Sequence, residues 1–250
     1  MKLGIMQPYF FPYLGYFSLI KHTDKFILFD PVQFIRHGWI ERNRVLKPEN
    51  DWQYINVPLE KHSLDTKIKD IKINNENDWK SKILSQLQHY KKKSPFYKQT
   101  VAVVEDGLDI ITDSIVELNA HTMESVCRYL GINFDYEIFS QMNLKIDEVN
   151  APDEWALNIC KAYPDADEYW NPQGGLEFFD RNKYEQAGIK LFFQKVNIKP
   201  YPQRRGPENI ITGLSIIDVM MFNSPEKISE MLDDFELLQR TGRISRPRAG

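Results

Sequence analysis

Two short apolar runs near the start of the chain constrain its fold most strongly. The runs Leu3 to Met6 and Phe26 to Phe29 have the length and composition of strands that are buried on both faces. Between them, Gly15 to His22 can form about two turns of helix. The carboxyl ends of such strands form the edge where open α/β sheets bind their ligands. The sequence therefore predicts an α/β fold with a binding loop after each strand.

The rest of the chain supplies further elements of both kinds. Apolar residues at helical spacing fill the middle of the chain, and helices and strands alternate in the C-terminal half. We therefore expect an N-terminal strand-helix-strand sheet core, a helical middle segment and a mixed α/β C-terminal half. Extended segments are expected at 52–58, 71–73, 134–139, 168–170 and 189–196, and helices at 78–90, 96–104, 115–129, 152–163, 180–187, 214–222 and 225–238.

The domain organisation is expected to be simple, because no linker rich in Pro, Gly or Ser divides the chain. We expect one domain over residues 1–250. A polar stretch at Asn143 to Ala151 is the best candidate for a seam between two sub-lobes, 1–142 and 143–240. The basic end, 241–250, is expected to be a flexible tail.

Composition excludes several classes of protein. The chain has 250 residues, of which 42% are hydrophobic and 27% charged, as in globular proteins. Its net charge of −3 argues against a nucleic-acid binder. Cys127 and Cys160 lie in helix-like patterns without a CxxC spacing, which indicates core thiols in a reducing compartment. No apolar run reaches about 18 residues, so we expect a cytoplasmic protein without membrane insertion.

The sequence lacks the common cofactor and nucleophile motifs. It contains no GxGxxG, no GxxxxGK[ST], no GxSxG and no HExxH. The five histidines are scattered without the spacing of metal ligands. We therefore predict no metal and no resident cofactor.

The first candidate site is the loop that follows the first strand. Gln7, Tyr9 and Tyr13 place an amide and two phenols beside Pro8 and Pro12, which fix the backbone at little entropic cost. Such a preorganised loop suits ligand binding. The alternative is that these aromatic side chains only cover the end of the sheet.

The second candidate site follows the second strand, in the segment DPVQFIRHGWIERNRVL. If this segment is a loop, its guanidinium and amide groups converge on the same rim as Gln7. Guanidinium groups suit bidentate contacts with phosphate, and an indole can stack on a base or a sugar ring. The alternative is a solvated helix face in which Glu41 pairs with Arg44. The candidate residues are Asp30, Gln33, His37, Trp39, Arg42, Asn43 and Arg44.

Two further clusters come from the C-terminal half. In the segment Asn171-Pro172-Gln173-Gly174-Gly175, paired glycines let backbone N–H groups approach a ligand, and Asn171 offers an amide to sugar hydroxyls. A tight structural turn explains the same segment equally well. Further on, Ser215 is expected to cap a helix, whereas Asp218 can turn toward the cleft.

Taken together, these segments resemble the WbqC-like family of bacterial proteins associated with surface-polysaccharide (O-antigen) biosynthesis. The likeness runs nearly end to end, and Pro31 stands where the family usually has a second aspartate. The resemblance implies transfer of glycine or an aminoacyl group to an amino sugar of the repeating unit. It is carried by residues 5–17, Asp30-Pro31-Val32-Gln33-Phe34, Trp39, Arg42-Asn43-Arg44, 171–175 and 214–218.

Amide formation on a sugar amine needs an activated acyl donor and polar groups that face the developing oxyanion. Gln7, Arg42 and Arg44 can provide such groups without a covalent nucleophile. Asp30 is the favoured base for the attacking ammonium, because it directly follows a strand, and His37 competes for that role. The expected ligands are a nucleotide-linked amino sugar and an activated glycine or acyl donor.

Two alternative functions stay open. The chain can be an amide-forming ligase that uses ATP to activate a carboxylate, although an HxGH-type pair is missing. It can also be a non-catalytic subunit that binds sugar nucleotides for a glycosyltransferase. The candidate protein partners are accordingly a second copy of the chain or a glycosyltransferase.

Overall fold

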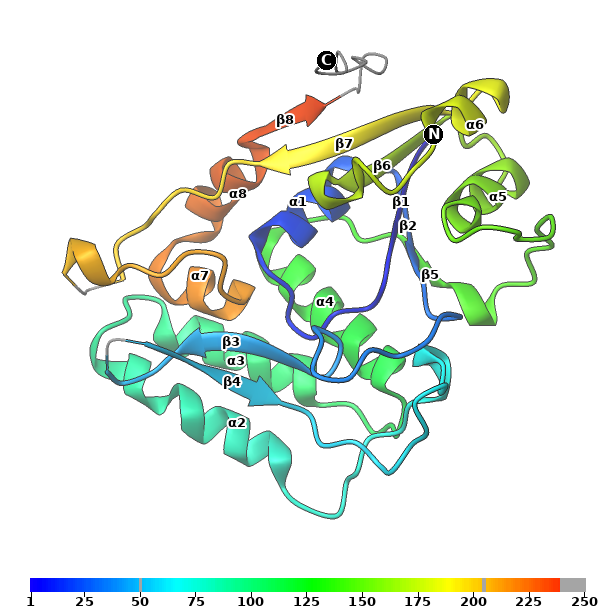
Figure 1. Ribbon diagram of the computed structural model, residues 1–250. Coiled ribbons are helices and arrows are strands. Elements are labelled where there is room, and N and C mark those ends of the chain that lie inside the picture. The colour runs from blue at the N-terminus through cyan, green and yellow to red at the C-terminus, as the bar shows by residue number, and fades with distance from the viewer. Residues whose placement is uncertain (50, 204–205, 239–250) are drawn as a thin grey trace, which may run out of the picture.

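The computed structural model describes residues 1–49, 51–203 and 206–238, and within these ranges the chain forms one six-stranded sheet and one separate hairpin (Figure 1). The strand order in the large sheet is β5-β2-β1-β6-β7-β8. All neighbours in the large sheet are parallel except β7 and β8. The α/β fold class is therefore confirmed. The strands of the large sheet are β1 (Lys2–Met6), β2 (Lys25–Leu28), β5 (Tyr136–Ile138), β6 (Glu168–Pro172), β7 (Lys190–Val196) and β8 (Phe235–Leu238).

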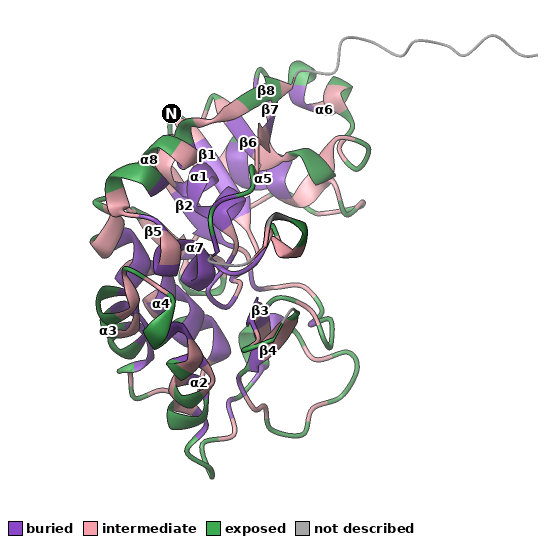
Figure 2. Cartoon of the chain, turned by 90° about the vertical axis from the view of Figure 1, so that its left-hand side faces the viewer, coloured by how far each residue is buried: buried purple, intermediate pink, exposed green. Residues whose placement is uncertain are grey.

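Strands β1 and β2, which both lie inside the sheet and not at its edges, are buried on both faces, as their apolar runs predict. Leu3 and Ile5 point to one side, where they join a core cluster with Leu157 of α5 (Glu154–Ala162) and Tyr184 of α6 (Arg181–Gln186). Phe26 belongs to a second cluster, which includes most of α1 (Leu14–His22). Figure 2 shows these central strands and α1 as a continuous buried region. The first strand, helix and second strand thus form as expected.

The middle of the chain is helical, as its spacing predicts. It contains α2 (Trp79–Leu87), α3 (Tyr97–Leu108) and α4 (Ile115–Leu130). Ser114 caps the start of α4, because its side chain accepts a hydrogen bond from the Glu117 N–H. The same helix ends at Gly131, whose φ of 65° is the left-handed conformation that favours glycine. The C-terminal half adds α7 (Ile216–Phe222) and α8 (Pro225–Asp233).

Two local predictions are wrong. Residues Arg42–Leu46 form strand β3, neither a loop nor a helix face, and pair with β4 (Trp52–Asn56) in an antiparallel hairpin. Asn43 and Val45 are buried and alternate with half-buried arginines, which is the period of a strand. The helix expected at 225–238 ends at Asp233 instead. The residues that follow add the edge strand β8, where backbone pairing with β7 outweighs continued helical periodicity.

The remaining expectations concern smaller segments. At 71–73 the chain makes isolated bridges from Lys72 and Ile73 and no named strand. The proposed seam at 143–151 does not divide the sheet, because β1 pairs with both β2 and β6. The tail at 241–250 lies outside the described residues. No helix within the described part of the chain is both long enough and apolar enough to cross a bilayer.

Candidate functional site

A cavity of about 660 Å³ lies at the carboxyl ends of β1, β2 and β6. Strand β1 stands between β2 and β6, so the order of strands along the chain reverses direction at this point of the sheet. Open α/β sheets bind ligands at such a switch point, and the volume is within the usual range for a small-molecule site. The cavity is lined by Gln7, which follows β1, by Phe29, which follows β2, and by Asn171 of β6.

The cavity wall combines aromatic rings with uncharged amides. Among the described residues that line it, none is Asp, Glu, Lys, Arg or His. A wall of this kind favours an uncharged polar ring, which can stack on aromatic faces and exchange hydrogen bonds with amides. Its aromatic residues are Tyr9, Phe29, Trp155, Tyr169, Phe178 and Phe179, and its amides are Gln7, Gln33, Asn150 and Asn171.

Asn171 is held in place by its neighbours. Its Nδ2 donates a hydrogen bond of 2.6 Å to the Tyr169 hydroxyl, which leaves Oδ1 available to accept from a ligand. A Cβ at Gly175 would clash with this Oδ1 and would lie 2.8 Å from the Phe179 ring. Gly175 is therefore needed for the close approach of these two side chains. Gly174 has open space where a Cβ would stand, so the predicted glycine pair divides into two different roles.

The other amides differ in how far they are engaged. The side chain of Gln7 makes no hydrogen bond with any described residue, so both ends of its amide are free for a ligand. Gln33 donates from Nε2 to the Leu64 carbonyl at 2.7 Å, which leaves its Oε1 as an acceptor. One cavity is thus lined by Tyr9 and by three predicted contacts from separate segments, Gln7, Gln33 and Asn171.

The loop that carries Gln7 and Tyr9 is fixed by side chains from distant parts of the chain. Its prolines carry no N–H, so the loop cannot satisfy its own carbonyls by a regular ladder. Phe11 has a φ of 38°, an unfavourable value for a bulky side chain that the surrounding bonds must hold. The donors are Tyr16 to the carbonyl of Gln7, Asn119 to Pro8, Asn43 to Phe10 and Phe11, Ser215 to Phe11, and the N–H of Ile216 to Pro12.

Two tyrosines of this loop have different surroundings. Burial raises the pKa of the hydroxyls of Tyr9 and Tyr13, so both keep their proton and can donate hydrogen bonds. Tyr9 lines the cavity, with its ring centroid 5.6 Å from that of Tyr16. Tyr13 is not part of the cavity wall, and its ring covers the position where a Cβ of Gly15 would stand.

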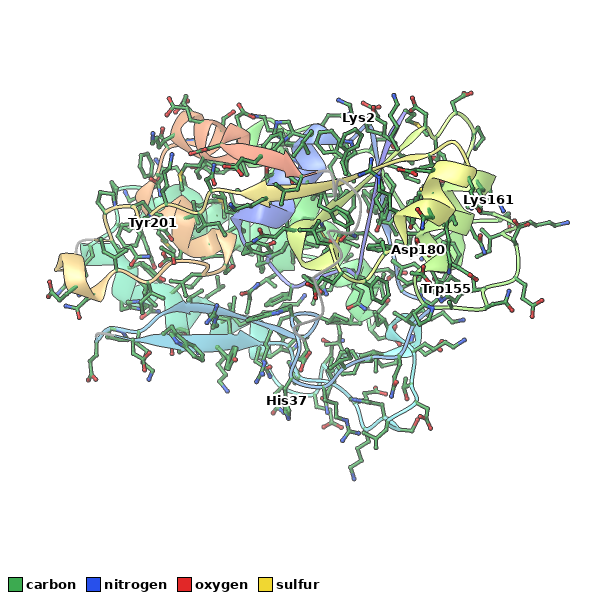
Figure 3. All side chains as sticks on the ribbon, turned by 45° about the horizontal axis from the view of Figure 1, so that its top comes forward. Lys2, His37, Trp155, Lys161, Asp180 and Tyr201 are labelled. Carbon is green, nitrogen blue, oxygen red and sulfur yellow. The ribbon has the colours of Figure 1, made fainter. Side chains whose placement is uncertain are left out.

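The two expected bases, Asp30 and His37, do not line the cavity. Asp30 is 1% exposed, and its carboxylate accepts hydrogen bonds from the Ser140 N–H at 3.0 Å and the Ser140 hydroxyl at 2.5 Å. Burial raises the pKa of the Asp30 carboxyl, and these two bonds oppose that effect. His37 is exposed on the loop before β3, and Figure 3 shows it well apart from Trp155 on α5, which lines the cavity. The backbone carbonyl of His37 accepts a bond from Arg42.

The predicted arginines lie on the β3–β4 hairpin, outside the cavity wall. The Arg42 guanidinium lies 3.9 Å from the ring centroid of Tyr54. The Arg44 guanidinium lies 5.3 Å from the Trp39 ring and 5.2 Å from the Trp52 ring, and its Nη2 donates to the Gly213 carbonyl at 3.2 Å. We call Trp39, Arg42, Arg44, Trp52 and Tyr54 the guanidinium strip.

Asn43 and Asp218, both predicted to bind substrate, are instead buried in the scaffold. Asn43 is 4% exposed and bonds to the loop after β1. Asp218 is fully buried, and its carboxylate accepts bonds from the hydroxyls of Tyr90 at 2.6 Å and Tyr201 at 2.5 Å, and from Gln203 Nε2 at 2.9 Å. The capping role expected for Ser215 is confirmed, since its side chain accepts from the Ile217 N–H.

Sequence reasoning missed most of the aromatic wall. Trp155 fits the apolar spacing of the helix expected at 152–163, a pattern that does not distinguish a core residue from a ligand contact, and it lines the cavity. Phe178 and Phe179 follow the Gly174–Gly175 pair, and an aromatic pair just after a glycine turn is the signal that could have found them. Among the described residues, no group of three or more His, Cys, Asp or Glu side chains could hold a metal ion.

Comparisons with known proteins agree with the sequence likeness. The chain is 26% identical to uncharacterized protein Rv1507c of Mycobacterium tuberculosis, and the alignment covers 89% of this chain and 93% of that protein. No solved structure shows significant similarity to the chain. The family model of the WbqC-like proteins matches residues 7–230. The chain therefore belongs to the WbqC-like protein family.

Proposed function

We propose that this protein is a cytoplasmic transferase of bacterial surface-polysaccharide (O-antigen) biosynthesis. It adds glycine, or a related acyl or aminoacyl group, to the amine of a nucleotide-linked amino sugar. The observation that carries the proposal is the uncharged cavity at the switch point of the sheet, with its mixture of aromatic rings and amides. The resemblance to the WbqC-like family supplies the polysaccharide context.

The cavity suits the amino-sugar part of such a substrate. Sugar hydroxyls need both donors and acceptors, which the Gln7 amide and Asn171 Oδ1 provide. The apolar face of a sugar ring packs on an aromatic side chain, and Tyr9 and Trp155 offer such faces. Gln7 and Tyr9 stand on a loop in which the carbonyls of Gln7, Pro8 and Phe10 are tied to neighbouring elements, so little ordering accompanies binding.

The uncharged wall also suits an amine that acts as a nucleophile. Burial without a carboxylate partner disfavours the ammonium form, so the pKa of the bound amine falls and the neutral amine is populated near pH 7. The amine nitrogen attacks the acyl carbonyl carbon, the C–N bond forms and the bond to the leaving group breaks. The amine proton passes to solvent or to the leaving group. Gln7 Nε2 and the Tyr9 hydroxyl supply donors to the oxyanion.

This assignment changes the role of the groups that the sequence favoured as bases. Asp30 is covered and engaged by Ser140, and His37 stands outside the cavity wall. We therefore place neither side chain in contact with the amine, and we propose that desolvation of the amine, without a general base, produces its neutral form. The same lack of a titratable wall residue other than tyrosine favours a second candidate function, a non-catalytic subunit that binds the sugar nucleotide.

A calorimetric titration with UDP- and TDP-linked amino sugars tests the binding step. We expect saturable binding by the wild type and a loss of at least about tenfold in affinity for the Gln7→Ala/Asn171→Ala variant. Gln99→Ala, at an exposed position of α3, is the matched control and should bind normally. Absence of binding by the folded wild type, or equal binding by all variants, contradicts the proposal.

The second part of the test separates the candidate functions. Each bound sugar nucleotide is incubated with a glycyl thioester, or with glycine and ATP, and analysed by mass spectrometry. A glycylated sugar formed from the thioester alone supports the transferase. A product that requires ATP identifies the ligase alternative, and tight binding without any product identifies the binding subunit.

A further inference from the structure

The uncharged cavity leaves the charged part of the proposed substrate without a partner. A nucleotide-linked sugar carries a diphosphate, and moving that anion into an uncharged apolar wall is costly. None of the described residues that line the cavity is a cation. The diphosphate must therefore lie outside the cavity, where cationic groups can contact it.

The guanidinium strip has the geometry of an anion site. Arg42 and Arg44 are two residues apart in β3, so their side chains leave the same face of the hairpin. Each guanidinium is held over an aromatic ring, Tyr54 for Arg42 and both Trp39 and Trp52 for Arg44. Both Nε atoms are buried, and the Nη2 of each arginine donates to a backbone carbonyl, so the remaining N–H groups of the Nη atoms are the donors for an anion.

These two arginines also lack acidic partners. Arg128 and Arg181 each form an ion pair, with Asp106 at 2.8 Å and Glu185 at 2.7 Å. In the part of the chain that the structure describes, Arg42 and Arg44 form none. Their Nε atoms are buried and have no hydrogen-bond acceptor there.

The carboxylate nearest in sequence is buried and forms no ion pair with the strip in the part of the chain that the structure describes. Glu41 precedes β3 and lies on its buried side, with 6% of its surface exposed. Burial raises the pKa of this carboxyl, which disfavours the charged form. The charge of the nearby Arg42 opposes this effect of burial on the pKa of Glu41, and no ion pair neutralises either guanidinium of the strip within the described residues.

The strip and the cavity share one scaffold. Tyr9 lines the cavity, and the next residue, Phe10, donates from its N–H to the Trp39 carbonyl at 2.9 Å. Asn43, between the two arginines, donates to the Phe10 carbonyl at 3.0 Å. The loop after β1 thus has the cavity on one side and the hairpin on the other.

We propose that the guanidinium strip binds the diphosphate of the nucleotide-linked acceptor while the cavity holds its sugar. This inference rests on the proposed function for the identity of the substrate, and on the strip alone for the binding of the anion. It divides the substrate between a charged subsite and an uncharged one, linked by the loop at 7–13.

Calorimetric titration with inorganic pyrophosphate, and separately with UDP, tests the strip without any sugar. The test variant is Arg42→Gln/Arg44→Gln, because glutamine keeps a donor for the carbonyls of His37 and Gly213 while it removes the charge. Arg128→Gln on α4 is the matched control. Thermal unfolding checks that each variant is folded, and Arg44→Lys gives a second variant that keeps the charge but not the planar fork.

We expect both anions to bind the wild type and Arg128→Gln, and to bind Arg42→Gln/Arg44→Gln at least about tenfold more weakly. Binding should weaken as salt rises, since the strip is only half-buried. Gln7→Ala/Asn171→Ala should leave pyrophosphate binding unchanged. Equal affinity of the folded double variant and wild type, or no binding by wild type, overturns the proposal. If amino-sugar nucleotides bind nevertheless, the proposed function survives; if only pyrophosphate binds, the strip stands and the proposed function fails.

Discussion

Replacement of Asn43 by alanine should destabilise the protein before it affects any ligand. The Asn43 side chain donates to the carbonyls of Phe10 and Phe11 at 3.0 and 2.9 Å, and its Oδ1 accepts from the Arg44 N–H at 2.8 Å. All of these bonds lie on the buried side of β3. Asn43, which the sequence predicted to contact the substrate, is therefore expected to behave as a structural residue.

The magnitude follows from the groups that the substitution leaves without partners. Ser215 still donates to the Phe11 carbonyl at 2.7 Å, so that group keeps a partner. The Phe10 carbonyl loses its side-chain donor, and an unsatisfied buried polar group costs about 1–3 kcal/mol. Loss of the remaining hydrogen bonds adds about 1 kcal/mol. We expect a loss of about 3 kcal/mol in the free energy of unfolding, or about 6–12 °C in Tm for a chain of this length.

Thermal unfolding of Asn43→Ala and of Asn77→Ala measures this difference. Asn77 is exposed in the segment before α2, so its replacement should change stability by no more than about 0.5 kcal/mol. Ligand binding by Asn43→Ala, measured well below its Tm, should fall only as far as the loop at 7–13 is disturbed. An unchanged Tm together with abolished ligand binding would refute the structural reasoning and restore Asn43 as a ligand contact.

Three further predictions concern the cavity, a buried carboxyl and a buried thiol. Gly175→Ala should weaken amino-sugar nucleotide binding at least about tenfold, because its Cβ displaces Asn171, while Gly174→Ala, with open space at its Cβ, binds normally in the same titration. Burial raises the pKa of the Asp30 carboxyl above its value in the unfolded chain, so the folded state takes up a proton before the unfolded state does as pH falls. The free energy of unfolding, relative to that of Asp30→Asn, should therefore rise as pH falls from 7 toward 4. Urea unfolding of both proteins across this range checks the sign. Burial raises the pKa of the Cys160 thiol to about 12, so native protein should react with Ellman's reagent far more slowly than unfolded protein.

Local sequence patterns predicted most of the fold because local rules govern those elements. The apolar runs of β1 and β2 and the helical spacing of α4 with its Gly131 end need no knowledge of distant contacts. The pattern at Arg42–Leu46 is ambiguous, because its charged residues are typical of a segment exposed to solvent. The aromatic rings that pack on these arginines, Trp52 and Tyr54, come from further along the chain. The edge strand β8 forms because its backbone pairs with that of β7, and a local sequence pattern cannot predict such a distant partner.

The candidate site was predicted in part for the same reason. The carboxyl ends of parallel strands meet at one edge of a sheet, so residues near these ends are expected to lie close together. Gln7, Gln33 and Asn171 do line one cavity there. Residue type could not show which polar side chains face the cavity. Asn43 and Asp218 look like ligand contacts in the sequence, but both are buried and hydrogen-bonded within the protein. Asn43 bonds to the loop after β1, and Asp218 accepts bonds from Tyr90 and Gln203.

The loop at 7–13, rich in aromatic residues and proline, is a scaffold that depends on other elements of the fold. Proline removes N–H donors, so the carbonyls of the loop depend on donors from elsewhere, and Asn43, Asn119 and Ser215 each reach it from a different element. A change at Asn43 or Asn119 leaves a buried carbonyl of the loop without its side-chain donor, and we expect it to disturb the wall that holds Gln7 and Tyr9. The loop and the side chains that fix it therefore form the scaffold that shapes the cavity and borders the guanidinium strip, and the proposed ligand contacts are a smaller set carried on it.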